Sequence, residues 1–394
     1  MENIRERIHE LTEARRQEFT DLSHFIYQHP ELGNEEFLSS KAHADYLKKH
    51  GFEVEMPYLD IPTAFRATYD SGKPGPTISY LSEYDALPGI GHGCGHNLLG
   101  AVESTAGIVL RYLLDEIGGR VIVLGTPAEE TNGAKVTMAE KGTFDDIDIA
   151  LATHPNDTWE ASSKSMALEP LAFEFYGKTT HASETPHKGI NALDAAVAFY
   201  VNLSMLRQQI EPQNKVHAII KEGGLAANII PDYSRVECYV RTMTMPELRD
   251  LSRKVIACAE AAAIASGCRM EYNNFEFIFE NLITNETLSD RFNQNMSELG
   301  IHLPPAEEGE LGSLDMGNVS QVVPAFNAYY SISENKPVTG HTVEFRDYSI
   351  SPAAEDAGLL TVEGLVKTGL DIITEPELLE AIRAEFAKAV QRPE

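Results

Sequence analysis

The stretch TISYL at residues 77–81 opens a strand–helix–strand unit that decides the fold of this chain. It is short and mostly apolar, as is RVIVL at residues 120–124, and both runs indicate buried strands. Between them, residues 98–117 carry a helical pattern, with Asn97 as the expected cap and Gly118-Gly119 as the stop. A helix between two buried strands predicts a mostly parallel sheet covered by helices.

The pattern continues on both sides of this unit. Helical faces precede it, and IDIAL at residues 147–151 indicates a third buried strand. Residues 167–280 then read strand-helix-strand-strand-helix-strand, which is typical of a ferredoxin-like sandwich. We therefore predict an α/β catalytic domain formed by residues 1–166 and 281–394. A ferredoxin-like α+β domain, residues 167–280, is inserted into it.

Composition limits the partners of the protein. A chain of 394 residues with a formal net charge of −28 would repel nucleic acid and anionic membrane surfaces. The first residues lack the apolar core of a signal peptide, and no run is long enough to span a bilayer. The four cysteines, at 94, 238, 258 and 268, show no disulfide framework. We expect a cytoplasmic protein without nucleic-acid or membrane partners.

Polar clusters follow each of the three predicted strands. Asp85 follows the first, Glu129-Glu130 the second and His154 the third. Open parallel sheets bind ligands at the carboxyl ends of their strands, so these side chains are expected to meet. A solvated charge pair is the alternative for the two glutamates. In a site, one glutamate could hold a metal while the other acts as a general base for amide hydrolysis.

The segment GHGCGHN at residues 91–97 adds further metal-binding side chains. In an extended chain His92, Cys94 and His96 would point the same way, and cysteine with histidine suits zinc. The alternative is a glycine-rich turn that holds a buried cysteine. The segment therefore favours a metal site.

Seven short motifs along the chain resemble a known family. It comprises the dinuclear metallopeptidases and amidohydrolases that include aminoacylase, carboxypeptidase G and aminobenzoyl-glutamate hydrolase. The aminobenzoyl-glutamate hydrolase and HmrA-like branch is the most similar. The motifs, in order, are QHPELG at 28–33, EYDALP at 83–88, CGHN at 94–97, PAEE at 127–130, HAS at 181–183, NIIPD at 228–232 and GHT at 340–342.

The resemblance implies a zinc-peptidase-like catalytic domain with two divalent metal ions per chain. Zinc is expected, with manganese or cobalt as alternatives. Glu129 would be the general base and acid, and Asp85 would orient a ligand ring, because metal-bound histidines usually have such a partner. Relatives commonly carry a ligand histidine at the position of Glu83, and His96 is expected to replace it. The implied metal ligands are Cys94 as the bridge, His96 and His154 on one ion, and Glu130 and His341 on the other.

The same resemblance assigns roles to the inserted domain. It would act as a lid and as the surface of a homodimer or higher homo-oligomer. His181 would stabilise the oxyanion across the dimer, while Asn228 and Arg241 would bind the substrate. Without the motif, His181 would be a structural histidine and Arg241 a surface ion pair. The loop at 312–315 is expected to line the site, and the role of His92 stays open.

These observations together predict a metal-dependent hydrolase of small amides that carry a free carboxylate. Dipeptides, N-acyl amino acids and aminobenzoyl-glutamate are the expected substrates. Glu129 would take a proton from the attacking water and deliver it to the leaving nitrogen. Three alternatives stay open: a metal-dependent endopeptidase, an amidase with Cys94 as nucleophile, and a non-catalytic protein that stores or senses zinc.

Overall fold

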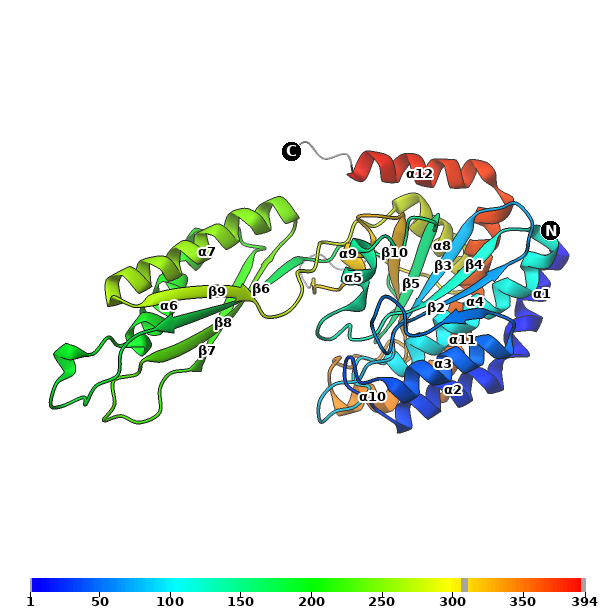
Figure 1. Cartoon of the computed structure of the whole chain (residues 1–394). Helices are drawn as coiled ribbons and strands as arrows, with labels where there is room; N and C mark the ends of the chain where they lie inside the picture. The colour runs from blue at the N-terminus through cyan, green and yellow to red at the C-terminus, as the bar shows by residue number, and fades with distance from the viewer. Residues whose placement is uncertain (1, 306–310, 391–394) are drawn as a thin grey trace. The chain divides into compact units, whose positions relative to one another are not determined.

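A computed structural model describes residues 2–305 and 311–390 of the chain (Figure 1). These residues divide into two compact units. Unit 1 contains residues 2–164, 282–305 and 315–390, and unit 2 contains residues 165–281 and 311–314. The short segment 311–314 departs from the division predicted from the sequence, because it packs with unit 2.

Unit 1 is built on a six-stranded sheet with the order β1-β2-β4-β3-β5-β10. The four strands from β4 to β10 are parallel, whereas β1 and β2 add an antiparallel edge. All six residues of β3 are buried, as expected for a strand with both faces covered. The strands are β1 (Glu53–Glu55), β2 (Phe65–Asp70), β3 (Thr77–Ser82), β4 (Arg120–Gly125), β5 (Ile149–Asn156) and β10 (Ala325–Ser331).

Helices cover this sheet on both faces (Figure 1). The central one is α4, whose residues from His96 to Leu110 are all buried. A Cβ at Gly107 would lie 2.3 Å from Val123 Cγ2, so glycine there lets α4 approach β4 closely. The helices of unit 1 are α1 (Glu2–Glu13), α2 (Arg16–Gln28), α3 (Phe37–Lys49), α4 (His96–Ile117), α5 (Ala134–Glu140), α8 (Glu286–Glu298), α9 (Met316–Val319), α10 (Val343–Tyr348), α11 (Pro352–Thr374) and α12 (Pro376–Val390).

Strand register brings the ends of β3 and β4 to the same level. Ser82 lies opposite Gly125, and the Thr126 N–H donates to the Ser82 carbonyl over 2.8 Å. The loops that carry Asp85 and Glu129-Glu130 therefore leave the sheet side by side. This geometry explains why side chains distant in the sequence meet at this edge.

Unit 2 is a four-stranded antiparallel sheet with two helices. Its strand order β7-β8-β6-β9 with β-α-β-β-α-β connectivity is the ferredoxin-like pattern. The elements are β6 (Ala167–Tyr176), η1 (Pro186–Lys188), α6 (Ala192–Leu206), η2 (Arg207–Gln209), β7 (Lys215–Glu222), β8 (Tyr233–Thr242), α7 (Met245–Ser266) and β9 (Arg269–Asn274). The predicted fold class, a mostly parallel α/β domain with a ferredoxin-like insertion, is confirmed.

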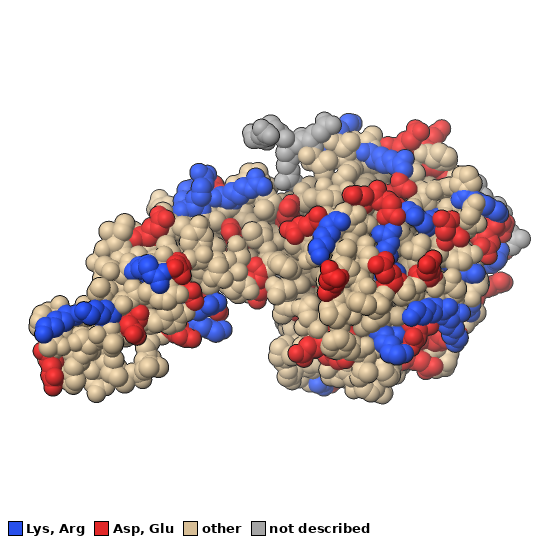
Figure 2. Space-filling view, in the orientation of Figure 1, with Lys and Arg blue, Asp and Glu red and all other residues tan. Residues whose placement is uncertain are grey.

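The surface in Figure 2 shows acidic and basic side chains interspersed on the visible face of both units. Within residues 2–305 and 311–390, no helix is long and apolar enough to cross a membrane.

Candidate metal centre

The glycine-rich segment forms a tight turn rather than a strand. The Gly93 N–H donates to the Gly91 carbonyl over 2.7 Å, and Gly95, the residue immediately before α4, has a φ of 77°. The expectation of an extended chain is therefore wrong, because the turn and the first residue of the helix bring Cys94 and His96 together. Asn97 is not the cap of α4, since the helix already begins at His96.

The turn also explains why His92 takes no part in the cluster of donors. Its ring is buried, and Nε2 lies 3.1 Å from the Ile26 carbonyl. Burial, followed by the nearby charge of His96, lowers the pKa of His92 to about 4. His92 is thus a neutral side chain that packs against α2.

Asp85 holds His96 and the glutamate loop together. Its Oδ1 lies 2.8 Å from His96 Nδ1, and its Oδ2 accepts the Glu130 N–H over 3.0 Å. Burial alone would raise the pKa of Asp85, but the charge and hydrogen bond of His96 keep that pKa below its usual value. This contact leaves Nε2 of His96 facing the site, 3.1 Å from Glu83 Oε2.

His154 and His341 complete the surroundings of Cys94. His154 lies near the carboxyl end of β5, with Nδ1 2.7 Å from the Pro155 carbonyl and Nε2 3.5 Å from Cys94 Sγ. His341 has a φ of 60° and places Nε2 3.3 Å from Glu130 Oε1. Its N–H donates to the Gly93 carbonyl over 2.9 Å, so the turn holds the segment that carries His341.

The possible metal donors form three groups, in each of which the donor atoms lie within 4.8 Å of one another. Cys94 belongs to two of them, so these two groups meet at its sulfur. The third group contains Glu83, which was not predicted as a ligand. The groups are Cys94 with His96 and His154, Cys94 with Glu130 and His341, and Glu83 with His96 and Glu129.

Glu129 lies beside these donors in an acidic environment. Burial, followed by the charges of Glu83, Asp315 and Glu130, raises the pKa of Glu129 well above its usual value. Burial acts in the same direction on Glu130, but pairing with His341 outweighs it and lowers the pKa of Glu130. The two adjacent carboxyl groups therefore have separate environments, unlike a solvated charge pair.

A buried lysine completes the site and was missed in the sequence. Lys135 on α5 donates to Glu83 Oε1 over 2.8 Å and to Asp315 Oδ1 over 2.7 Å. Burial alone would lower the pKa of Lys135, but the charges of Asp315 and Glu83 raise that pKa, so the ammonium stays charged. A lysine on a short helix gives no sequence signal of such a role. Asp315 was expected near the site only as part of the loop at 312–315.

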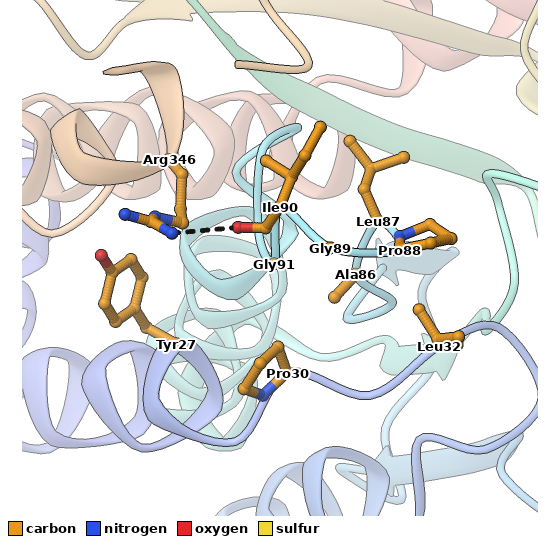
Figure 3. A pocket seen from close by; sticks show the side chains of 10 residues that line it. All are labelled: Tyr27, Pro30, Leu32, Ala86, Leu87, Pro88, Gly89, Ile90, Gly91 and Arg346. Carbon is orange, nitrogen blue, oxygen red and sulfur yellow. Dashed lines mark hydrogen bonds between the residues drawn. The ribbon is translucent and has the colours of Figure 1, made fainter. Parts of the chain in front are cut away.

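Next to this centre, the loop between Asp85 and His92 borders an open pocket of about 520 Å³ (Figure 3). The lining is mostly apolar, with Tyr27 and Arg346 as its polar members. Arg346 Nη1 donates to the Ile90 carbonyl over 3.2 Å and so ties α10 to the loop. None of the predicted site residues lines this pocket.

The three remaining predicted site residues belong to unit 2. His181 and Asn228 come from neighbouring segments, since His181 pairs with Ile229 and the Ala182 N–H donates to the Asn228 carbonyl. Both side chains are exposed. Arg241 lies on β8, where Nη1 donates to Ser313 Oγ over 2.7 Å. It lines a separate pocket of about 480 Å³ with Arg207, Lys215 and His217.

One segment, nearly all of it in unit 2, is similar to a known peptidase domain. Residues 163–266 match the peptidase dimerisation domain of the M20 peptidases. Over 394 aligned residues the chain is 39% identical to a human Xaa-Arg dipeptidase, covering 94% of this chain and 89% of the relative. It is 33% identical to one of the subunits of the p-aminobenzoyl-glutamate hydrolase of Escherichia coli K12, covering 76% of this chain and 66% of that relative.

Solved structures show the same fold. A putative aminohydrolase from methicillin-resistant Staphylococcus aureus has a TM-score of 0.77 at 22% identity, covering 93% of this chain and 99% of its own. A dinuclear metal-binding M20 peptidase from Bacillus subtilis has a TM-score of 0.63 at 19% identity, covering 89% and 98%. The chain belongs to the M20 family of peptidases. The predicted family and the predicted reaction class, hydrolysis of amide bonds, are thereby confirmed.

Proposed function

We propose that this protein hydrolyses the amide bond of small substrates whose leaving amine carries a free carboxylate. Dipeptides, N-acyl amino acids and aminobenzoyl-glutamate represent this class. The observation that carries the proposal is the pair of donor groups that meet at Cys94, directly beside Glu129. Two relatives support the substrate class, because their names specify a dipeptide that ends in arginine and a conjugate of glutamate.

The donor residues fit two divalent metal ions. His96 Nε2 and Glu130 Oε1 are buried and lack a well-aligned hydrogen bond within the described part of the chain, although His96 Nε2 lies 3.1 Å from Glu83 Oε2 and Glu130 Oε1 lies 3.3 Å from His341 Nε2. A thiolate, imidazoles and a carboxylate suit zinc, with manganese or cobalt as alternatives. Cys94 would bridge, His96 and His154 would hold one ion, and Glu130 and His341 the other. The bound ions supply Lewis acidity for the attacking water and the scissile carbonyl.

Proton transfer in this proposal belongs to Glu129. A carboxylate with a raised pKa can accept a proton from the attacking water and then protonate the leaving nitrogen. Asp85 keeps the His96 ring in place through its 2.8 Å contact with Nδ1. Burial raises the pKa of the Cys94 thiol in the absence of a metal ion, and a bound divalent ion would hold Cys94 as the thiolate.

Unit 2 offers a face for a second copy of the chain. Val197, Val201 and Met205 are spaced by four residues on α6 and are 47%, 52% and 61% exposed. Ile219 on β7 is 57% exposed, and β7 is an edge strand. Apolar side chains on a helix and an unpaired strand edge favour a homodimer through this face. His181 and Asn228 would then reach the partner's site, and Arg241 would bind the substrate carboxylate.

We also propose a cytoplasmic location. All four cysteines of the chain are free, which fits a reducing compartment.

Metal analysis combined with chelation tests the proposal. The purified protein should contain up to two divalent ions per chain, and a strong chelator should abolish hydrolysis that zinc, manganese or cobalt restores. Hydrolysis that persists in the stripped protein would instead support the Cys94 nucleophile.

Mixed dimers of His181→Ala and Glu129→Gln chains, each inactive alone, should recover part of the activity if His181 acts across the dimer.

A further inference from the structure

Ala128, immediately before Glu129, has a backbone conformation that alanine rarely adopts. Its φ is 62°, in the left-handed region that favours glycine. The residue is fully buried, three positions beyond the end of β4. Strained non-glycine residues persist only where surrounding contacts hold them, and they occur mainly at functional sites.

The contact that holds Ala128 comes from Glu36, 92 residues earlier in the chain. Glu36 Oε1 accepts the Ala128 N–H over 2.9 Å, and Oε2 accepts the Thr63 hydroxyl over 2.9 Å. The Glu36 side chain is fully buried. A buried carboxylate forms strong hydrogen bonds to backbone N–H groups, so this bond can offset the strain at Ala128.

The segment around Glu36 also fits closely against the glutamate loop. A Cβ at Gly33 would lie 3.0 Å from Ala128 Cβ and 2.8 Å from Thr131 Oγ1. On its other side, the loop is held by Asp85, which accepts the Glu130 N–H. Two buried carboxylates therefore fix the backbone on both sides of Glu129. A change of φ at Ala128 would turn the Glu129 side chain away from its present direction.

We propose that Glu36 is a positioning residue that aims Glu129 by holding Ala128 in the left-handed conformation. Glu36 belongs to none of the three donor groups, so it acts through the backbone rather than on a metal ion. The inference rests on the proposed role of Glu129 as general base. If Glu129→Gln kept full activity, the proposed function would fail, whatever the Glu36 variants did.

The first test compares three substitutions of buried residues. Glu36→Gln keeps a carbonyl that can accept the Ala128 N–H, whereas Glu36→Met has similar length and no strong acceptor. We expect Glu36→Met to lower kcat about 10- to 100-fold, the scale of small misplacements of a reacting group, with KM and metal content unchanged. Glu36→Gln should stay within about threefold of the wild type. Thr63→Val, which removes only the other hydrogen bond, should lower stability and leave kcat unchanged.

The second test uses the strain itself. In an Ala128→Gly background the left-handed conformation has no steric cost, so Glu36→Met should lower kcat much less there than in the wild type. If Glu36→Met does not fold, Glu36→Asp replaces it, because the shorter carboxylate cannot reach Ala128 without a backbone shift. Three results would each overturn the proposal. The first is a wild-type kcat in Glu36→Met or Glu36→Asp, and the second is a loss of kcat in Glu36→Gln as large as that in Glu36→Met. The third is a loss of kcat on Glu36→Met that is the same in the Ala128→Gly background as in the wild type.

Discussion

Lys135 Nζ lies 2.7 Å from Asp315 Oδ1, although the two residues are 180 positions apart and the whole of unit 2 lies between them in the sequence. Neither side chain is exposed to solvent. The same ammonium lies 2.8 Å from Glu83 Oε1. One lysine thus joins the end of β3, helix α5 and the returning segment of unit 1, and it keeps two carboxylates in place close to Glu129.

Replacing Lys135 with Met should destabilise the protein strongly. Two carboxylates would remain buried without their counter-ion, and breaking a buried pair in this way typically costs about 3–5 kcal/mol. The free energy of unfolding from denaturant titration measures the loss. Lys48→Met, at an exposed position of α3, is the matched control and should change it by less than about 0.5 kcal/mol. Equal stability of the two variants would contradict a charged Lys135.

Glu129→Gln and Glu130→Gln should fail in different ways. Glu129→Gln should retain the metal ions and lower kcat by at least about 100-fold, the scale of general acid-base catalysis. Glu130→Gln should instead lower metal content, because Glu130 is a proposed ligand beside His341. Elemental analysis and single-turnover rates separate the two effects. If both variants lost metal equally and kept equal activity, the assignment of Glu129 as general base and Glu130 as metal ligand would be wrong.

The sequence predicted the fold class well because the pattern is local. The apolar composition of a short run indicates that it is buried. This holds for residues 77–81, for residues 120–124 and for the helix between them. The same strands placed Asp85, the two glutamates and His154 at one edge. There the structure groups Glu130 and His154 with Cys94, and Asp85 and Glu129 with His96. The general rule for parallel sheets was sufficient for these residues.

Other contacts could not be predicted because they depend on long-range packing. The extended-chain argument grouped His92 with Cys94, but the turn at 91–95 directs His92 towards α2. Nothing in the local sequence distinguishes Lys135 from other helical lysines, because its partner Asp315 is 180 positions away. Glu36 likewise gives no sign that it accepts the N–H of Ala128. Each of these roles depends on a partner that is distant in the sequence.

A charge on the exposed face of α6 should produce monomers. Val201→Asp places a carboxylate in the middle of the apolar stripe, where dimer formation would bury it without a partner. Sedimentation or light scattering would measure the mass. Ile264→Asp on α7, at a position that is 82% exposed, is the control and should leave the dimer intact. Dimers of Val201→Asp as stable as the wild type would place the interface elsewhere.

Glu36 should also make stability depend on pH. Burial, followed by the charge of Asp85, raises the pKa of Glu36 from 4.5 to about 7. The folded state then binds more protons than the unfolded state between these values, so this contribution to stability falls as pH rises from about 4.5 to 7. Glu36→Gln removes the titrating group. Its stability relative to the wild type should improve by about 2–3 kcal/mol between about pH 5 and pH 8.

Thermal or chemical unfolding at both pH values measures this change. Glu35→Gln, at the exposed neighbouring position, is the control, and its stability should follow the wild type across the range. A difference between Glu36→Gln and the wild type that is constant with pH would show that Glu36 does not titrate there.

Arg241 should make the enzyme selective for a free carboxylate on the leaving amine. Arg241 lines a pocket together with Arg207, Lys215 and Glu211, so the charged residues of this lining are three basic and one acidic. Esterifying or amidating the substrate carboxylate should lower kcat/KM about 10- to 100-fold, because a hydrogen bond to a charged group contributes about 1.5–3 kcal/mol. Arg241→Met should cause a similar loss for the free acid and little further loss for the blocked substrate.

Arg235→Met is the matched control for Arg241. Arg235 lies on the same strand, but its guanidinium already pairs with Glu174 and Glu237, at 3.3 and 3.0 Å. Its replacement should therefore change kcat/KM for free and blocked substrates by the same small factor. If the wild type cleaved both substrates equally well, anchoring by Arg241 would be wrong. Internal cleavage of long unblocked peptides would favour an endopeptidase instead, because the bond cut would then lie far from any terminal carboxylate.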